Sequence, residues 1–307
     1  MSLRINNNIE SMNAHRNLLM NDRALSKSLE RLASGQKINR AADDPAALVI
    51  SEHMRAQVSG MEQAIRNNEV AISLVQTAEG SMNEISNILV SLRQRAISAA
   101  NVGASDQDMI DANQAEIENA LASIDRVVST TQFGHYKLLD GTNAAKTETN
   151  EDGSISTQEG LRFHVGPNAE HMASTSIRDM STSALGRVTV KEGEMPNKSN
   201  FMSLADIDVR NEQGAQDALA IIDQALTEVA SVRGELGAFQ KHTLESNLTS
   251  LQVAAENMTA AESTIRDTDM AQELATFTRN QIMTQSATAQ LAQANAMPQH
   301  VLRLLNG

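Results

Sequence analysis

Apolar residues in the first third of the chain recur at the three-, four- and seven-residue steps of one helical face. The pattern runs from Ile5 to Leu32 and is interrupted at Gly35. Asp44 followed by Pro45 then predicts a new helix, with Asp44 as its N-cap and Pro45 at the first helical position, where the missing N–H costs nothing. The chain is therefore expected to begin with one helix and to enter a second near residue 45.

A coiled-coil repeat characterises this second helix. Its apolar residues alternate in three- and four-residue steps, and this 3.5-residue period predicts a seam against other helices. The predicted seam consists of Val58, Met61, Ile65, Ile72, Val75, Met82, Leu89 and Ala96, with polar exceptions at Asn68, Glu79 and Ser86. After Gly103, Ser105 is expected to cap a third helix. The apolar stripe of that helix comprises Ile110, Ile117, Leu121, Ile124 and Val128.

Residues 134–214 have a different texture. Eight of the 15 glycines and two of the four prolines lie there, which argues against long helices in this segment. Residues 161–165 and 187–190 alternate like short strands. We therefore expect a small β-containing insertion.

Helical spacing resumes after residue 214. Gly234 and Gly237 fall inside this pattern and cost about 1 kcal/mol each relative to Ala, which suggests close contact of the backbone with a neighbour, or a bend. Asp269 predicts the start of a last helix. The second seam comprises Leu219, Ile222, Leu226, Val229, Leu236, Leu244, Leu248, Leu251, Met258 and Ile265, and the stripe of the last helix comprises Met270, Leu274, Phe277, Ile282, Met283 and Leu291.

Together these patterns predict a mainly α fold. We expect a long antiparallel helical bundle or coiled coil formed by the N- and C-terminal arms, with a small central β-containing insertion. Three seams of comparable length can satisfy one another in a bundle. The amphipathic ends, residues 3–33 and 270–305, have no third helix to cover them. Such ends either stay disordered or fold against copies of the same chain.

Composition agrees with a thin helical core. Hydrophobic residues make up 41% of the 307 residues but aromatic residues only 2%, and residues 46–166 and 197–297 contain no Pro. The net charge of −13 disfavours general binding to nucleic acid, because phosphates would repel the chain. The absence of Cys excludes disulfides, thiolate metal sites and thiol chemistry.

No residue pattern supports an enzyme, a cofactor or a metal site. No two of the seven His residues have the zinc spacing with an intervening Glu, and Asp267 with Asp269 lacks the rest of a calcium loop. We find neither a phosphate-binding glycine loop nor a G-x-S-x-G elbow. We expect no membrane insertion, because the longest charge-free stretch is rich in amides. The first residues lack the apolar region of a cleaved signal peptide, so we expect export by another route.

The uncharged stretch at residues 280–302 is more informative. It is bracketed by Arg279 and Arg303, whereas helices that face solvent usually carry Lys and Glu. Because desolvated charges are costly, the pattern favours a surface that faces other copies or a confined aqueous lumen. A plain solvent-facing side is the alternative.

Several segments, taken together, resemble bacterial flagellins. They cover nearly the whole chain in the order typical of the family, so the resemblance is specific. Those segments include residues 28–35 (SLERLASG), 42–46 (ADDPA), 76–80 (QTAEG), 165–169 (VGPNA), 261–267 (AESTIRD) and 291–295 (LAQAN).

The resemblance implies a structural protein, a subunit that polymerises through its terminal helices into the bacterial flagellar filament used for swimming. It implies that the arms at 1–44 and 265–307 are disordered in the monomer and form the inner tube of the filament. Residues 45–186 and 206–264 would form the helical bundle core with its β-hairpin region, and 187–205 a short surface insertion, a rudimentary outer domain at most. Implied partners are other copies, an export chaperone, a cap protein and hook–filament junction proteins, after unprocessed secretion by the flagellar export apparatus.

In this framework the terminal stripes supply candidate subunit-interface residues. They are Ile5, Ile9, Met12, Leu25, Leu29, Leu32, Leu274, Phe277, Ile282, Leu291, Leu302 and Leu305. Gln285 and Gln293 are candidate lumen residues, because a wall without fixed charge would not trap unfolded cargo electrostatically.

The resemblance also implies an animal Toll-like receptor as a partner. Many flagellins carry an Arg-Glu-Leu run on the second helix, and the matching positions here are Arg93, Gln94 and Arg95. Only Arg93 is kept, although Glu116 fits the pattern, so we expect weakened recognition.

Three other interpretations remain open. A hook–filament junction protein would share the architecture but would not form long polymers after seeding. An enzyme carried in the β insertion would require a zinc motif, and none occurs. A monomeric coiled-coil adhesin would have ordered termini in solution.

Overall fold

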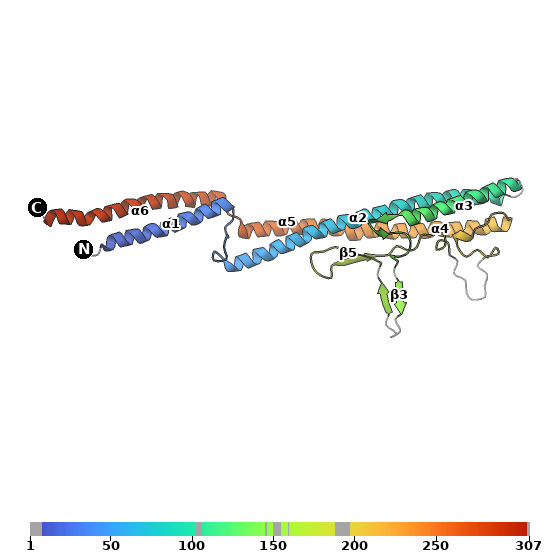
Figure 1. Ribbon diagram of the computed structural model, residues 1–307, viewed down its shortest axis with the longest axis horizontal. Coiled ribbons are helices and arrows are strands. Elements are labelled where there is room, and N and C mark those ends of the chain that lie inside the picture. Colours follow the sequence, from blue (N-terminus) through green and yellow to red (C-terminus); the bar gives the residue numbers. More distant parts are fainter. Residues whose placement is uncertain are drawn as a thin grey trace. The chain divides into compact units, whose positions relative to one another are not determined.

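The computed structural model describes residues 8–101, 106–144, 146–149, 155–158, 160–187 and 197–305 (Figure 1). Within these ranges the chain is mainly helical with short strands in the middle, which confirms the predicted fold class. The chain divides into two compact units. The terminal unit is drawn from Met1–Ser59 and Ala255–Gly307, and the central unit is Gly60–Ala254. Helices α2 (Pro45–Ala100) and α5 (Ser246–Arg266) contribute to both.

Two helices make up most of the terminal unit, α1 (Ile9–Ser34) and α6 (Met270–Leu305). They lie side by side and antiparallel (Figure 1). The predicted interruption at Gly35 is confirmed. This residue ends α1 with a φ of 71°, a left-handed conformation that glycine adopts without steric cost. Asp269 is confirmed as the cap of α6, because its carboxylate accepts the first free backbone N–H groups of that helix.

Residues 35–44 lead the chain from α1 into α2 beside the junction of α5 and α6. The Lys37 N–H donates to the Arg266 carbonyl at 2.7 Å, and the Thr268 N–H donates to the Gly35 carbonyl at 2.9 Å. This short antiparallel contact joins the two arms of the terminal unit. Helix α2 begins at Pro45 and Asp44 accepts from the Ala47 N–H at 3.0 Å, as predicted.

The structure buries five of the eight apolar positions predicted for the seam of α2. Those at Met61, Val75, Met82, Leu89 and Ala96 are buried as expected, together with Asn68. Val58, Ile65 and Ile72 are only half-buried, although Ile72 still packs against the core. Further buried positions, which the pattern did not include, are Ala64, Ala71, Leu74, Ala78, Ile85, Leu92 and Ala99. Small alanines complete the seam because they let neighbouring backbones approach closely.

Helices α3 (Gln107–Thr130) and α4 (Glu212–Ala238) complete the bundle of the central unit. The predicted stripe of α3 is buried. Its N-cap position is Asp106, and the predicted cap Ser105 lies outside the described residues. Leu219 and Leu226 of α4 are half-buried and pack against the core, beside the fully buried Ala218 and Ala225. The buried positions of α4 are Gly214, Ala215, Ala218, Ile221, Ile222, Ala225, Val229, Val232 and Leu236.

A widened turn separates α4 from α5. This π-helix, η2 (Phe239–Glu245), begins two residues after Gly237. An added Cβ at Gly234 or Gly237 would meet no described atom within 4 Å, so the predicted close backbone contact is wrong within this chain. The π turn accommodates one extra residue, which explains why the buried Leu236 and Leu244 are eight residues apart rather than seven.

In the described residues between α3 and α4, the chain forms three antiparallel strand pairs. They are β1 (Gln132–Phe133) with β2 (Tyr136–Lys137), β3 (Lys146–Thr149) with β4 (Ile155–Gln158), and β5 (Leu161–His164) with β6 (Met172–Thr175). The predicted strand at 161–165 is therefore confirmed. Of the second predicted strand, Arg187 is not in a strand, and 188–190 lie outside the described residues. A 3-10 turn, η1 (Leu204–Asp206), precedes α4.

Asparagines fasten the β5–β6 hairpin to the helices. The Asn247 and Asn68 amides donate to the Val165 carbonyl at 2.6 Å and 3.3 Å. Gly60 of α2 leaves room for the hairpin turn, since an added Cβ would lie 3.2 Å from the Pro167 Cβ. The hairpin is thus held by side chains that the apolar pattern did not reveal.

Candidate self-assembly surface

The seam between α1 and α6 is half polar. Its positions recur in three- and four-residue steps on both helices, as in a coiled coil. Those on α1 are Asn8, Ser11, Ala14, Leu18, Asn21, Leu25, Ser28 and Leu32, and those on α6 are Glu273, Phe277, Asn280, Thr284, Ala287, Leu291 and Ala294. Such a seam removes little apolar area from water, so it contributes little hydrophobic stabilisation.

Hydrogen bonds cross this seam and fix its register. The Asn8 amide donates to the Ala294 carbonyl at 2.8 Å, and the Ser11 hydroxyl donates to Asn295 at 2.6 Å. At the other end, Arg31 and Glu273 form an ion pair at 3.6 Å. Among the described atoms, the Glu273 Oε1 and the Thr284 hydroxyl are buried without a hydrogen-bond partner. Unpartnered buried polar atoms cost free energy, which further weakens the pair on its own.

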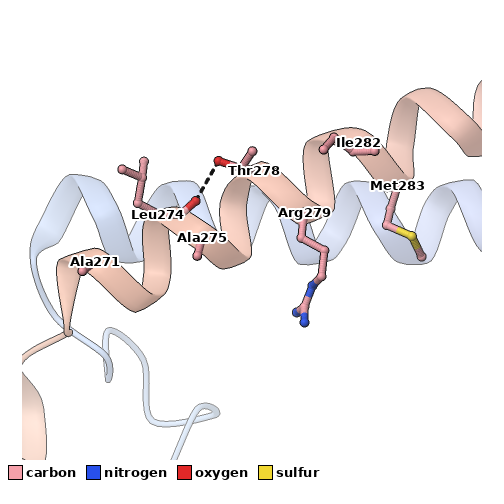
Figure 2. A pocket seen from close by; sticks show the side chains of 7 residues that line it. All are labelled: Ala271, Leu274, Ala275, Thr278, Arg279, Ile282 and Met283. Carbon is pink, nitrogen blue, oxygen red and sulfur yellow. Dashed lines mark hydrogen bonds between the residues drawn. The ribbon is translucent and has the colours of Figure 1, made fainter.

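Large apolar side chains instead point outward from both helices. Leu274 is 56% exposed and Ile282 is 58% exposed. They line an open groove along α6 with Ala271, Ala275, Thr278, Arg279 and Met283 (Figure 2). Among the side chains that the structure describes, the exposed large apolar residues on the two helices are Ile9, Met12, Leu19, Met20, Leu29, Met270, Leu274, Ile282, Met283 and Met297. Exposed apolar side chains gathered along a groove, as on α6, mark an interaction site in a water-exposed protein.

The predicted interface residues therefore separate into two groups. Ile9, Met12, Leu29, Leu274 and Ile282 point outward. Leu25, Leu32, Phe277 and Leu291 are half-buried in the seam between α1 and α6. Ile5 lies outside the described residues, as do the side chains of Leu302 and Leu305. The amphipathic pattern could not separate the two groups, because both consist of apolar residues at helical spacing.

A charged cluster beside α1 is a feature that sequence reasoning missed. The Lys27 ammonium lies 2.7 Å from the Asp43 carboxylate, and this hydrogen bond lowers the pKa of Asp43 below its usual value. Asp43 also accepts from the backbone N–H groups of Arg40 and Asn39. The pair ties the loop at 35–44 to α1.

A second ion pair joins the first turns of α2 to the end of α5. The Arg266 guanidinium donates to Glu52 at 2.6 Å and lowers the pKa of that carboxyl group. Arg266 is also the residue whose carbonyl accepts from Lys37. It therefore holds two segments of the terminal unit together.

Two absences apply to the described parts of the chain. No three His, Asp or Glu side chains there are arranged to hold a metal ion. None of the helices there combines the length and apolarity that a membrane crossing needs.

Comparison with known proteins identifies the family. The family models for the bacterial flagellin N-terminal and C-terminal helical regions match residues 5–144 and 219–305. The chain belongs to the bacterial flagellin family. Its relatives include the flagellin of Bacillus subtilis (strain 168), which is 41% identical over 99% of this chain and 100% of the relative. A flagellar filament 30.7 kDa core protein of Treponema maltophilum is 38% identical over 98% of this chain and 99% of the relative.

The solved structures agree with the fold. A putative flagellar hook-associated protein from Vibrio parahaemolyticus has a TM-score of 0.56 at 15% identity, over 73% of this chain and 100% of that chain. This likeness concerns the fold alone. Flagellins are structural proteins that form extracellular filaments, so this chain is a filament subunit. Nothing in the comparisons favours the hook–filament junction alternative.

The candidate receptor residues of this flagellin are exposed but engaged in ion pairs. Arg93 lies 2.6 Å from Asp223 of α4, and Arg95 lies 2.7 Å from Glu116 of α3. Gln94, between them, is exposed. Recognition by a receptor stays a prediction.

Proposed function

We propose that this flagellin assembles through the outward apolar faces of α1 and α6, and that these helices become stably ordered only when other copies cover them. The observation that carries the proposal is the distribution of apolar side chains over the helix pair. Its inner seam is half polar, whereas residues such as Leu274 and Ile282 remain more than half exposed. A protein that works as a monomer would bury its large apolar side chains in the seam, whereas this pair buries polar residues there and leaves apolar ones exposed.

The magnitudes support assembly as the source of stability. Completing the burial of one half-exposed Leu, Ile or Met contributes roughly 1 kcal/mol. The ten exposed side chains on the two helices could therefore contribute on the order of 10 kcal/mol per subunit. Ordering the arms consumes part of this gain. The remainder is enough for a polymer that forms spontaneously yet dissociates on heating or in acid.

We further propose that the arms at 1–44 and 265–307 form the inner tube, with residues 45–186 and 206–264 outside them. Gln285 and Gln293 are exposed on α6 and would line the lumen. The described part of 280–302 contains no ionised side chain. Unfolded subunits could pass along such a wall without electrostatic trapping.

The remaining partners are proposed from family membership. They are an export chaperone, a cap protein and the hook–filament junction proteins, with secretion through the flagellar export apparatus. We also propose that the protein has no enzymatic activity, because its surface supplies contacts rather than reacting groups.

Seeded polymerisation tests the assembly surface. Purified subunits are added to short filament fragments, and elongation is followed by light scattering and electron microscopy. Leu274→Ser and Ile282→Ser should each slow elongation at least about tenfold, because each removes apolar contact area. Val70→Ser is the matched control, since Val70 is 54% exposed in the central unit. Wild-type elongation by both α6 variants would overturn the proposal.

A further inference from the structure

Methionine is the only sulfur-containing residue in this chain, with 15 Met and no Cys. Buried methionines such as Met61, Met82 and Met180 belong to the core. Five others are at least 44% exposed on the helices of the terminal unit. These are Met12 at 69%, Met20 at 61%, Met270 at 51%, Met283 at 51% and Met297 at 44%. The exposed surface of α1 and α6 is therefore rich in thioethers.

We propose that these five residues, the terminal methionines, form an oxidation-sensitive site that controls whether a free subunit can join the filament. The inference rests on the proposed assembly through α1 and α6. Hydrogen peroxide is the oxidant. The thioether sulfur attacks a peroxide oxygen, an S–O bond forms and the O–O bond breaks. The sulfur loses two electrons, and the peroxide is reduced to water. The product is methionine sulfoxide.

The environment of Met283 shows why a sulfoxide would block assembly. Met283 lies at one end of the apolar groove that Leu274 and Ile282 line (Figure 2). The Thr278 hydroxyl in this groove already donates to the Leu274 carbonyl at 2.9 Å. Arg279 is the remaining side-chain donor along it. When another subunit covers the groove, a sulfoxide oxygen would lose its water and meet mainly apolar atoms, which is unfavourable.

Oxidation of the terminal methionines should be slow once the subunit is assembled. Contact with other copies would cover the terminal methionines, so peroxide would reach them mainly in the free subunit. The site would therefore act before polymerisation and leave existing filaments intact. Methionine sulfoxide reductases reverse the modification, which makes the block reversible.

Exposed methionines in the central unit supply a matched comparison. Met109 is 53% exposed, Met172 is 46% exposed and Met202 is 52% exposed. They should react with peroxide as readily as the terminal methionines. Because they lie outside α1 and α6, their oxidation should not slow addition to seeds.

The experiment combines peroxide with two leucine variants of the full chain. The terminal variant carries Leu at Met12, Met20, Met270, Met283 and Met297, and the central variant carries Leu at Met109, Met172 and Met202. Leucine keeps the apolar surface and cannot be oxidised. Each protein is treated with hydrogen peroxide, its sulfoxides are located by mass spectrometry, and elongation from untreated seeds is measured.

Oxidised wild type and the oxidised central variant should elongate at least about tenfold more slowly than untreated protein, while the oxidised terminal variant should stay within about twofold of its untreated rate. Reductase treatment should restore the wild type. Unchanged elongation of wild type with confirmed terminal sulfoxides would overturn the inference, as would equal protection by the central variant. Failure of untreated wild type to elongate from seeds would instead contradict the proposed assembly.

A second measurement covers a terminal variant that fails to assemble even before oxidation. Free wild-type subunits and intact filaments are exposed to the same peroxide, and the oxidation rate of each methionine is compared. The terminal methionines should react at least about tenfold more slowly in the filament than in the free subunit. Equal rates in the two states would overturn the inference.

Discussion

Gly60 shows how the absence of a side chain lets two segments pack closely. It lies in α2 against Pro167 of the β5–β6 hairpin, with 3.2 Å between an added Cβ and the Pro167 Cβ. Gly80 occupies the same helix with no described atom within 4 Å of an added Cβ. Gly80→Ala should stabilise the protein by about 0.5–1 kcal/mol through helix propensity.

Gly60→Ala should lack this gain and be neutral or destabilising by up to about 1 kcal/mol, because the added methyl group crowds Pro167. The two variants are compared by urea unfolding of the central unit. Equal stabilisation by both substitutions would show that Pro167 moves away from the added methyl group without a loss of stability, which would contradict close packing at Gly60.

Asp43 predicts how the terminal unit responds to acid. Its pKa is lowered in the folded state by the Lys27 hydrogen bond, so the pair stabilises at neutral pH and is lost as the pH falls through that lowered pKa. Asp43→Asn filaments should dissociate at a lower temperature than wild type at pH 7. The difference should begin to shrink as the pH falls toward 3.8, the ordinary pKa of the group, and should vanish only below the lowered pKa of the folded state.

Thermal dissociation of filaments at a series of pH values measures this effect. Asp22→Asn is the control, because Asp22 is on α1, the helix that carries Lys27, and is in no ion pair among the described residues. If the difference in dissociation temperature between wild-type and Asp43→Asn filaments persists unchanged at low pH, the charge of Asp43 is not its source.

At the scale of elements, the apolar pattern located the helices but not every contact face. It predicted the start of α2 and the end of α1, because caps are local chemistry. It assigned Ile65 and Ile72 to the α2 seam where Ala64 and Ala71 are buried, since a hydrophobicity pattern favours the larger side chain. Close helix packing selects small residues instead, and only the neighbouring helix decides which face is used.

The same limit applies to the assembly surface. Sequence spacing marked Leu25 and Leu29 alike, yet one is half-buried against α6 and the other is 50% exposed. The polar members of the seam, such as Asn8 and Ser11, could be recognised only once their partners on α6 were in place.

The π-helix η2 explains an irregular step in the apolar pattern, the eight-residue spacing between Leu236 and Leu244. Leu236 and Leu244 stay on one face because the widened turn takes up one extra residue. Deleting Lys241, which is exposed in η2, should convert the turn to regular α-helix and keep that face aligned. We expect a loss of no more than about 1 kcal/mol in the free energy of unfolding.

Deletion of Ala230 is the matched control for this prediction. Ala230 is exposed in the regular part of α4, so its removal rotates Val232 and Leu236 away from the core. This deletion should cost more than about 4 kcal/mol or prevent folding. Chemical unfolding followed by circular dichroism compares the two deletion variants. Similar losses in the free energy of unfolding would contradict the conclusion that η2 takes up one extra residue.

At the scale of the whole molecule, the terminal unit should change its stability on assembly while the central unit does not. Amide hydrogen exchange of dilute subunits should show little protection in α1 and α6 and strong protection in α2, α3 and α4. In filaments, α1 and α6 should become strongly protected. Strong protection of both terminal helices in dilute, non-polymerising subunits would favour a self-sufficient monomer.

The lumen proposal predicts an effect on growth in the cell that is absent from assembly in vitro. Gln285→Lys with Gln293→Lys would add two positive charges to each subunit of the inner wall, and the helical repeat would multiply them along the tube. Because this flagellin carries a net charge of −13, unfolded subunits in transit should be retarded by the wall. Flagella should therefore be shorter, whereas purified variant should elongate from seeds at the wild-type rate. Gln285→Asn with Gln293→Asn controls for the loss of the glutamines. Slow growth in both settings would place these residues in a subunit contact instead of the lumen.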